Sequence, residues 1–167
     1  MQRALFIGRF QPFHNAHLLD IKKILKEADE AIIAIGSSQE KNTLENPFSY
    51  EERERMIIDT LKNHDIAKYK IYPVPDLYED KKWVEFVKNN LPKYDFVYSG
   101  NYWTLKCFKK FDAKVKKIHL IKGISSTIVR NMMIKNKNWQ KLVPKKISDH
   151  IDKINGVERI KVIYSKK

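Results

Sequence analysis

Near the beginning of the chain, residues 4–17 read Ala-Leu-Phe-Ile-Gly-Arg-Phe-Gln-Pro-Phe-His-Asn-Ala-His. The opening apolar run predicts a buried strand that ends in Gly8, where the missing side chain lets the backbone come close to a ligand. A turn with proline follows, and then an amphipathic helix begins near His14 and His17. Residues three apart share a helix face, and a helix N-terminus offers unpaired N–H groups and partial positive charge. The segment therefore predicts a phosphate site that both histidines face, rather than two unrelated surface histidines.

Strand-like and helix-like stretches alternate along the rest of the chain. Strands are expected at 4–8, 31–36, 69–73, 95–99 and 115–121. Helices are expected at 16–28, from the capping box at Ser49 to about residue 63, at 81–90, at 102–111, and from a cap at Ser125 to about residue 135; residues 139–154 are mostly helical, with a break or a new start at Pro144. This alternation favours βαβ units with right-handed crossovers. The prediction is an α/β fold: a Rossmann-like doubly wound parallel sheet with helices on both faces and a helical C-terminal segment, in a single domain over residues 1–167.

The predicted topology also places the site. In open parallel sheets, ligands bind outside the carboxyl ends of the strands, near the point where the strand order reverses. Gly8, Gly36 and Gly100 each follow a predicted strand. Since the histidine pair follows Gly8, the phosphate site is expected at this edge of the sheet.

The composition excludes several classes of protein. The chain has 33 Lys and Arg against 20 Asp and Glu, which gives a formal net charge of +13. The lysines are scattered rather than gathered in a basic block, so phosphorylated ligands are favoured over nucleic acid. The apolar runs are too short to span a bilayer, and no signal peptide is recognisable. The lone Cys107 is interpreted as a small buried side chain. We expect a cytoplasmic protein that binds neither nucleic acid nor membranes.

A second motif, Ile-Ser-Ser-Thr-Ile-Val-Arg at residues 124–130, again follows a predicted strand and opens a helix. Ser125 and Thr127 suit capping or the binding of phosphate oxygens. Arg130 follows Thr127 by three residues, and its planar guanidinium suits two phosphate oxygens at once. Taken alone, the motif reads as a serine cap with a solvated arginine. Together with the first motif, it favours a nucleotide phosphate site.

The two motifs together resemble those of the nucleotidylyltransferase superfamily, whose signatures are H-x-x-H or H-x-G-H and an I-S-S-T-x-x-R type. Further segments resemble the archaeal-type nicotinamide-nucleotide adenylyltransferase family, and the resemblance covers nearly the whole chain. These segments are Gly-Ser-Ser-Gln at 36–39, Thr-Leu-Glu-Asn-Pro-Phe at 43–48 with Glu52-Arg53, Ser-Gly-Asn at 99–101, and Gly-Val-Glu-Arg at 156–159.

The resemblance implies an enzyme that transfers the adenylyl group of ATP to nicotinamide mononucleotide, giving NAD and pyrophosphate. The phosphate of the mononucleotide attacks the α-phosphorus of ATP in line, without a protein nucleophile, and Mg²⁺ accompanies the ATP phosphates with no residue assigned to hold it. The catalytic residues implied are Arg9, His14, His17 and Arg130. These four residues also belong to the implied ATP site, together with Gly8, Phe10, Gly100, Asn101, Ser125 and Thr127.

The resemblance places the acceptor at Asp76, Asp80 and Trp83. Trp83 suits stacking on the pyridine ring, and a core tryptophan on the helix at 81–90 is an alternative of nearly equal weight. An acidic side chain such as Asp76 suits the carboxamide or the ribose hydroxyls. The family commonly has Asn at the position of Asp80, so this chain departs from the pattern there.

Three other functions compete with this interpretation. A sister adenylyltransferase or cytidylyltransferase would use another phosphorylated acceptor, such as phosphopantetheine. A basic nucleic-acid-binding module would account for the net charge but not for two strand-to-helix phosphate motifs. An inactive regulatory relative does not fit the intact His14, His17 and Arg130. The family further implies a homo-oligomer, often a hexamer.

Overall fold

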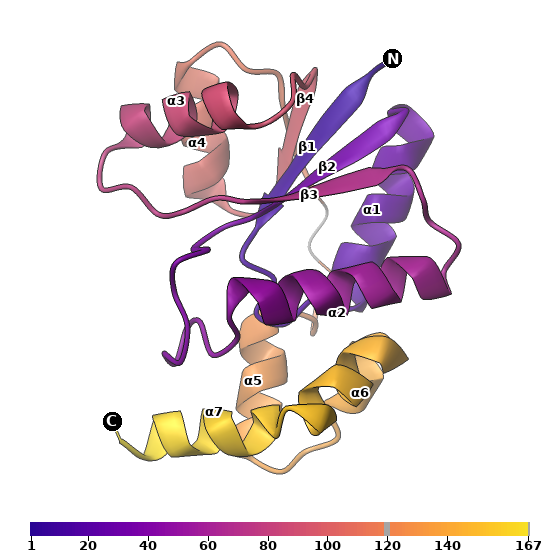
Figure 1. Cartoon of the computed structure of the whole chain (residues 1–167), viewed down its shortest axis with the longest axis vertical. Helices are drawn as coiled ribbons and strands as arrows, with labels where there is room; N and C mark the ends of the chain where they lie inside the picture. The colour runs from indigo at the N-terminus through magenta and orange to yellow at the C-terminus, as the bar shows by residue number, and fades with distance from the viewer. Residues whose placement is uncertain (119–120, 167) are drawn as a thin grey trace. The chain divides into compact units, whose positions relative to one another are not determined.

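The computed structural model describes residues 1–118 and 121–166. In this part of the chain, five strands form one parallel sheet in the order β3-β2-β1-β4-β5 (Figure 1). The strands are β1 (Arg3–Gly8), β2 (Glu30–Ile35), β3 (Tyr69–Pro73), β4 (Phe96–Ser99) and β5 (Val115–Lys117). The order runs outward in both directions from β1, which confirms the doubly wound parallel sheet.

The helices alternate with the strands and then continue alone. They are α1 (Asn15–Glu27), α2 (Tyr50–Asn63), α3 (Asp80–Asn90), α4 (Tyr102–Lys110), α5 (Ser126–Ile134), the short 3-10 helix η1 (Gln140–Leu142), α6 (Lys145–Lys153) and α7 (Gly156–Ser165). Pro144 directly precedes α6, so the predicted new start is confirmed. The capping box at Ser49 is present, with Ser49 and Glu52 each bonding the backbone of the other.

The last strand is shorter than predicted. A strand was expected over residues 115–121, whereas β5 covers only Val115–Lys117. Ile118 follows the strand and donates its N–H to the carbonyl of Ser99 over 3.4 Å, a long bond near the end of the pairing. Residues 119 and 120 lie outside the described residues.

Contacts between Cα atoms divide the chain into two compact units. The first comprises Met1–Gly8, Asp20–Ser38 and the described residues from Lys68 to Ile118, and it contains the sheet with α3 and α4. The second comprises Arg9–Leu19, Gln39–Ala67 and the described residues 121–166, and it contains α2, α5, α6 and α7. The boundary crosses α1, so the phosphate motif of residues 9–17 belongs to the second unit. The single domain over residues 1–167 stays a prediction.

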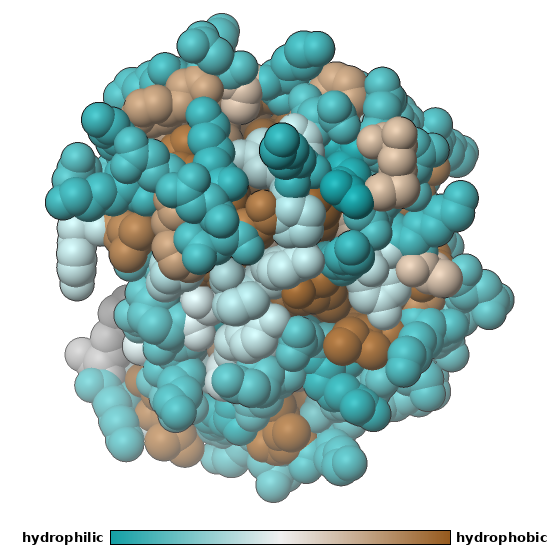
Figure 2. Space-filling model, turned by 45° about the horizontal axis from the view of Figure 1, so that its top comes forward, coloured by the Kyte–Doolittle hydropathy of each residue, from teal (hydrophilic) through white to brown (hydrophobic). Residues whose placement is uncertain are grey.

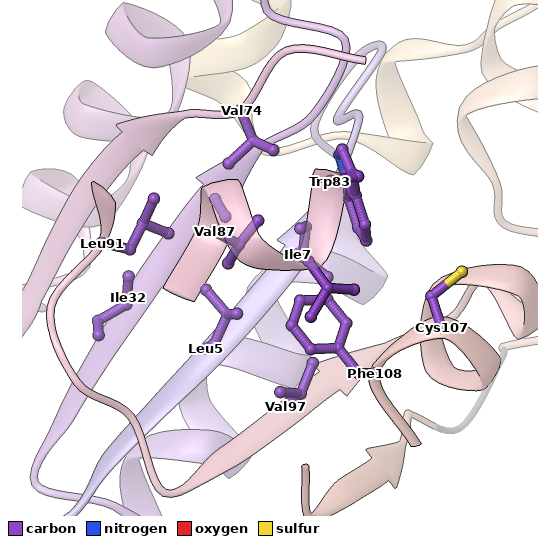
Figure 3. Packing of buried hydrophobic residues seen from close by; sticks show 12 residues of the cluster. Leu5, Ile7, Ile32, Val74, Trp83, Val87, Leu91, Val97, Cys107 and Phe108 are labelled. Atoms are coloured by element: carbon purple, nitrogen blue, oxygen red, sulfur yellow. The ribbon is translucent and has the colours of Figure 1, made fainter. Parts of the chain in front are cut away.

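The core of the first unit lies between the sheet and the pair α3 and α4 (Figure 3). Leu5 and Ile7 lie two residues apart in β1, so their side chains point to the same face of the sheet. Leu5 pairs in register with Ile32 of β2 and Val97 of β4, and all three are fully buried. Cys107 is buried in this cluster, as predicted. The part of α1 from Asp20 onward lies on the other side of the sheet (Figure 1), so helices cover both faces.

Contacts between helices hold the second unit together. His150 of α6 lies 2.7 Å from the carboxylate of Asp59 in α2. Arg159 of α7 forms two hydrogen bonds to the carboxylate of Glu52 in α2, over 2.7 and 2.9 Å. Asn155 takes the left-handed conformation (φ 51°) between α6 and α7, which Asn tolerates better than most residues. The C-terminal segment is therefore helical, as predicted, and is tied to α2.

The molecular face in Figure 2 is covered mainly by hydrophilic side chains, with a few apolar ones between them. Among the described residues, none of the helices combines the length and the apolar character needed to cross a membrane.

Close packing at the start of α7 gives a testable prediction. A Cβ at Gly156 would lie 2.9 Å from a ring carbon of Phe48, 3.0 Å from Cγ2 of Ile151 and 3.2 Å from its carbonyl oxygen. Since the Phe48 side chain is fully buried, it cannot move out into solvent. Gly156→Ala should therefore reduce the free energy of unfolding by about 1–3 kcal/mol, as measured by thermal or urea unfolding.

The sign of this effect is diagnostic, because Gly→Ala at an open helix position stabilises by about 1 kcal/mol. A suitable control is Ser165→Ala, an exposed change in the same helix that should leave stability within about 0.5 kcal/mol. A Gly156→Ala protein as stable as the original would contradict the packing described.

Candidate functional site

The two histidines of the predicted phosphate site lie one turn apart around the start of α1 and stack on each other. Their ring centroids are 3.5 Å apart, with 12° between the ring planes. The backbone N–H of each residue donates to Nδ1 of the other, over 3.2 Å to His17 and 3.4 Å to His14. Since a backbone N–H only donates, each Nδ1 is an acceptor, and the proton of each neutral ring is on Nε2. Each ring therefore carries a donor suited to a phosphate oxygen.

Burial keeps both imidazoles neutral at physiological pH. It lowers the pKa of His14 from 6.5 to about 4. It lowers the pKa of His17 well below 6.5 as well, and the neighbouring His14 adds to this shift. The pair therefore supplies N–H groups at pH 7 without supplying positive charge.

The lowered pKa of His14 predicts a stability that falls as pH falls from about 6.5 to 4. In this range the unfolded residue, with a pKa of 6.5, binds a proton that the folded residue, with a pKa of about 4, does not bind. Protonation then favours the unfolded chain. Over this range, the original protein should lose about 3 kcal/mol more of its free energy of unfolding than His14→Asn, whose amide does not titrate. Urea unfolding at a series of pH values measures the difference.

Protonation of Asp20 has the opposite effect on the free energy of unfolding. For this reason the original protein is compared with His14→Asn. Its carboxyl is buried, and burial raises its pKa from 3.8 to about 6, so between these values the folded chain binds the proton first. Because Asp20 is present in both proteins, its contribution cancels in the difference. Equal losses in the two proteins would contradict a neutral, buried His14.

The second motif lies against the first one. Ser125 caps α5 by accepting the backbone N–H of Ile128 over 3.2 Å. The hydroxyl of Ser126 donates to the carbonyl of Pro12 over 2.9 Å, and Nη1 of Arg130 donates to the carbonyl of Gln11 over 2.7 Å. These bonds connect the first turns of α5 to the loop that precedes the histidines. Thr127 is exposed on the same first turn.

Two arginines concentrate positive charge in this region. Burial lowers the pKa of Arg130, the nearby Arg9 lowers it further, and the carboxylate of Glu45 raises it. Nη1 of Arg9 lies 3.5 Å from this carboxylate, and both side chains are well exposed, at 49% and 75%. Such an exposed pair is weak. A bound anion with several negative charges would balance the two guanidinium groups better than Glu45 does.

The loop that carries Arg9 and Phe10 contains a residue in an unfavourable backbone conformation. Phe10 is in the left-handed region with a φ of 51°, which is unfavourable for a residue with a large side chain. The peptide bond between Gln11 and Pro12 is cis. Phe10 is buried, and its ring lies 4.8 Å from that of His17 in an edge-on arrangement. The aromatic side chain thus packs behind the histidines, while its backbone runs through the phosphate motif.

Two residues that support this loop were not among the predicted site residues. The guanidinium of Arg53 is fully buried and donates to the carbonyl of Arg9 over 2.8 Å and to that of Ser49 over 3.1 Å. The amide side chain of Gln11 donates to the carbonyl of Phe48 and accepts the N–H of Phe48, over 2.9 and 3.0 Å. In the sequence, Arg53 stands out only as part of a motif. Its hydrogen-bond partner, the carbonyl of Arg9, is 44 residues away, and no local pattern reveals it.

The remaining predicted residues belong to the first unit. Gly8 ends β1, and its carbonyl accepts the N–H of Gly36 over 2.9 Å. Asn101, which follows Gly100, caps α4 by accepting the N–H of Thr104 over 3.2 Å. The phosphate motif and these residues thus belong to different units.

The predicted acceptor residues also lie in the first unit. Asp76 is exposed, and the carboxylate of Asp80 lies 3.7 Å from Nζ of Lys110. Trp83 is only 4% exposed and packs in the core (Figure 3). This burial matches the alternative interpretation of Trp83 as a core residue, and its contact with a ligand stays a prediction.

Known proteins resemble this chain over almost its full length. A family described as "Cytidylyltransferase-like" matches residues 5–143. The chain is 42% identical over 166 residues to "Nicotinamide-nucleotide adenylyltransferase" of Methanococcus aeolicus, covering 98% of this chain and 96% of the relative. It is 38% identical over 168 residues to the protein of the same name from Pyrococcus furiosus, covering 98% and 89%.

A solved structure shares the fold. It is described as a bifunctional NMN adenylyltransferase/ADP ribose pyrophosphatase from Francisella tularensis, complexed with AMP and a Mn ion. The TM-score is 0.76 at 24% identity, and the match covers 96% of this chain but only 52% of that one. The present chain thus spans about half the length of the bifunctional protein.

Proposed function

We infer that this chain, which belongs to the nicotinamide-nucleotide adenylyltransferase family, transfers the adenylyl group of ATP to nicotinamide mononucleotide (NMN), with NAD and pyrophosphate as products. The observation that carries the inference is identity of 42% and 38% to two enzymes of this name over 98% of the chain. The phosphate site of the second unit supports it, because its donors and cations are of the kind that a triphosphate requires.

The reaction requires no covalent intermediate on the protein. A phosphate oxygen of NMN forms a bond to the α-phosphorus of ATP, and the bond from this phosphorus to the bridging oxygen of the β-phosphate breaks. The electron pair leaves with pyrophosphate. Catalysis then consists of aligning the two phosphates and stabilising the charge that moves toward pyrophosphate.

We assign these tasks to the residues of the phosphate motif. The Nε2–H groups of His14 and His17 would donate to ATP phosphate oxygens, and Arg9 and Arg130 would balance the charge that develops in the transition state. Ser125 and Thr127 would place hydroxyl and N–H groups of the first turn of α5 against phosphate oxygens. Gly8, Phe10, Gly100 and Asn101 would complete the ATP site. Asp76, Asp80 and Trp83 would form the acceptor site.

Mg²⁺ would enter as part of the substrate, bound to ATP. Within residues 1–118 and 121–166, no group of three or more His, Cys, Asp or Glu is placed to hold an ion. The phosphate oxygens of ATP would hold the ion.

The first experiment measures NAD formation by the purified protein with ATP, Mg²⁺ and NMN, coupled to alcohol dehydrogenase. NAD should form at enzymatic rates. ATP binding without NAD formation would contradict the proposed acceptor, and phosphopantetheine would be the next acceptor to test. A parallel assay with nicotinic acid mononucleotide determines the selectivity between the two pyridine nucleotides.

Variants of His17 test the role of its ring. Asn keeps an acceptor at the position of Nδ1, which the N–H of His14 requires, and removes the donor at Nε2. Gln instead places a donor near the position of Nε2. His17→Asn should lower kcat by about 100–1000-fold, and His17→Gln should recover part of this loss. Arg130→Ala should lower kcat to a similar extent.

Arg55→Ala is the matched control for the arginine, because this exposed guanidinium pairs only with Asp59 of the same helix among the ion pairs described. It should leave kcat unchanged. Turnover near the original rate in both His17→Asn and Arg130→Ala would contradict the assignment of the site.

The location and assembly of the enzyme stay proposals. A cytoplasmic homo-oligomer is what the family resemblance implies, with a hexamer as the specific expectation. Light scattering on the purified protein measures its mass, and a monomer would contradict this expectation.

A further inference from the structure

One face of α7 holds the chain where α2 begins. Nη1 and Nη2 of Arg159 donate to the two carboxylate oxygens of Glu52, over 2.7 and 2.9 Å. Nη1 also lies within bonding distance of the carbonyl of Pro47, at 3.3 Å. One turn earlier, Gly156 lies so close to Phe48 that a Cβ there would be 2.9 Å from its ring. Since residues three apart share a helix face, Gly156 and Arg159 grip the same short segment.

This segment, residues 47–53, also holds the loop of the phosphate motif. The buried guanidinium of Arg53 donates to the carbonyl of Arg9 over 2.8 Å. The amide of Gln11 bonds both backbone groups of Phe48, over 2.9 and 3.0 Å. Residues 47–53 therefore connect α7 to the loop that carries Arg9, through hydrogen bonds at each step.

The ion pair that begins this connection has a fixed geometry. The side chains of Arg159 and Glu52 are only 28% and 24% exposed, and both nitrogens of the fork are used. A bidentate pair of this kind fixes direction as well as distance. The same carboxylate accepts the backbone N–H of Ser49 over 2.9 Å, as part of the capping box. Without Arg159, this carboxylate would lose the cation that compensates its burial, and the start of α2 would lose its alignment.

We propose that Arg159 is a positioning residue for adenylyl transfer, which acts through Glu52 and Arg53 on the loop of Arg9. This inference rests on the proposed function. Arg159 makes no contact with ATP in it. Phe10 holds a left-handed backbone next to Arg9, and such a conformation persists only where the surroundings hold it in place. Because Arg9 acts on charge that develops in the transition state, a small displacement of its backbone would slow the reaction.

The test uses Arg159→Met, which keeps the apolar part of the side chain and removes the guanidinium. It should lower kcat by about 10–100-fold, the effect of a displacement of about 1 Å at a reacting centre. KM for NMN should stay within about twofold, because the predicted acceptor residues belong to the first unit. In calorimetric titrations, the Kd for ATP should rise by about two- to tenfold with an unchanged number of sites. Partial unfolding would instead lower the number of sites and leave the Kd unchanged.

His150→Ala is the matched control. It removes the other contact between the C-terminal helices and a carboxylate of α2, since Nε2 of His150 lies 2.7 Å from Asp59. Asp59 keeps Arg55 as a partner and lies outside residues 47–53. This variant should lose stability in urea unfolding, but kcat and the Kd for ATP should stay within about twofold of the original values.

A double variant gives a readout that a purely structural role would not change. In the background of Arg9→Ala, Arg159→Met should lower kcat by less than about threefold, because the guanidinium that it positions is already absent. A general loss of folded protein would lower kcat by the same factor in both backgrounds.

Several outcomes would overturn the inference. These are an original kcat and an original Kd for ATP in Arg159→Met, an equal loss of kcat in His150→Ala, and a full additional loss of kcat in the double variant. If the original protein forms no NAD from NMN, the proposed function fails. The titrations with ATP then still decide the role of Arg159, because a Kd that rises in Arg159→Met but not in His150→Ala supports positioning of the phosphate motif, and equal Kd values contradict it.

Discussion

The hydrogen bond from the buried guanidinium of Arg53 to the carbonyl of Arg9 is the contact on which the phosphate motif depends most. It connects α2 to a loop that carries Phe10 in a left-handed conformation. Such a backbone persists only where the surroundings compensate for it. Gln11 adds a second connection through both backbone groups of Phe48. The ring of Phe48 in turn packs where α7 begins, so the C-terminal helix contributes to the wall behind this loop.

In the phosphate motif, the hydrogen-bond donors and the positive charge come from different residues. Burial keeps His14 and His17 neutral, and mutual bonds to Nδ1 place their protons on Nε2. Arg9 and Arg130 supply the charge. Neutral donors beside two cations suit a phosphate chain, because additional positive charge on the rings would increase their repulsion from the two guanidinium groups. The bond from Arg130 to the carbonyl of Gln11 also fixes the direction of this side chain before any ligand binds.

The two tryptophans of the first unit show how a core position supports a surface position. The ring of Trp83 contacts the rings of both Phe108 and Trp103. In the sequence, Trp83 lies in a segment that resembles a known family, and Trp103 closely follows the Ser-Gly-Asn segment at 99–101 that resembles the same family.

The local patterns of this chain were sufficient to predict what depends on neighbours along the sequence. Apolar runs predicted the strands, the capping signals at Ser49 and Ser125 predicted two helix starts, and the three-residue spacing placed both histidines on one face. Tertiary structure alone decided the burial of Arg53 and its bond to Arg9, the neutrality of the histidines and the exposure of Trp103. The physical reason is that hydrogen-bond partners far apart in the chain, and the desolvation that shifts a pKa, exist only once the chain has folded around them.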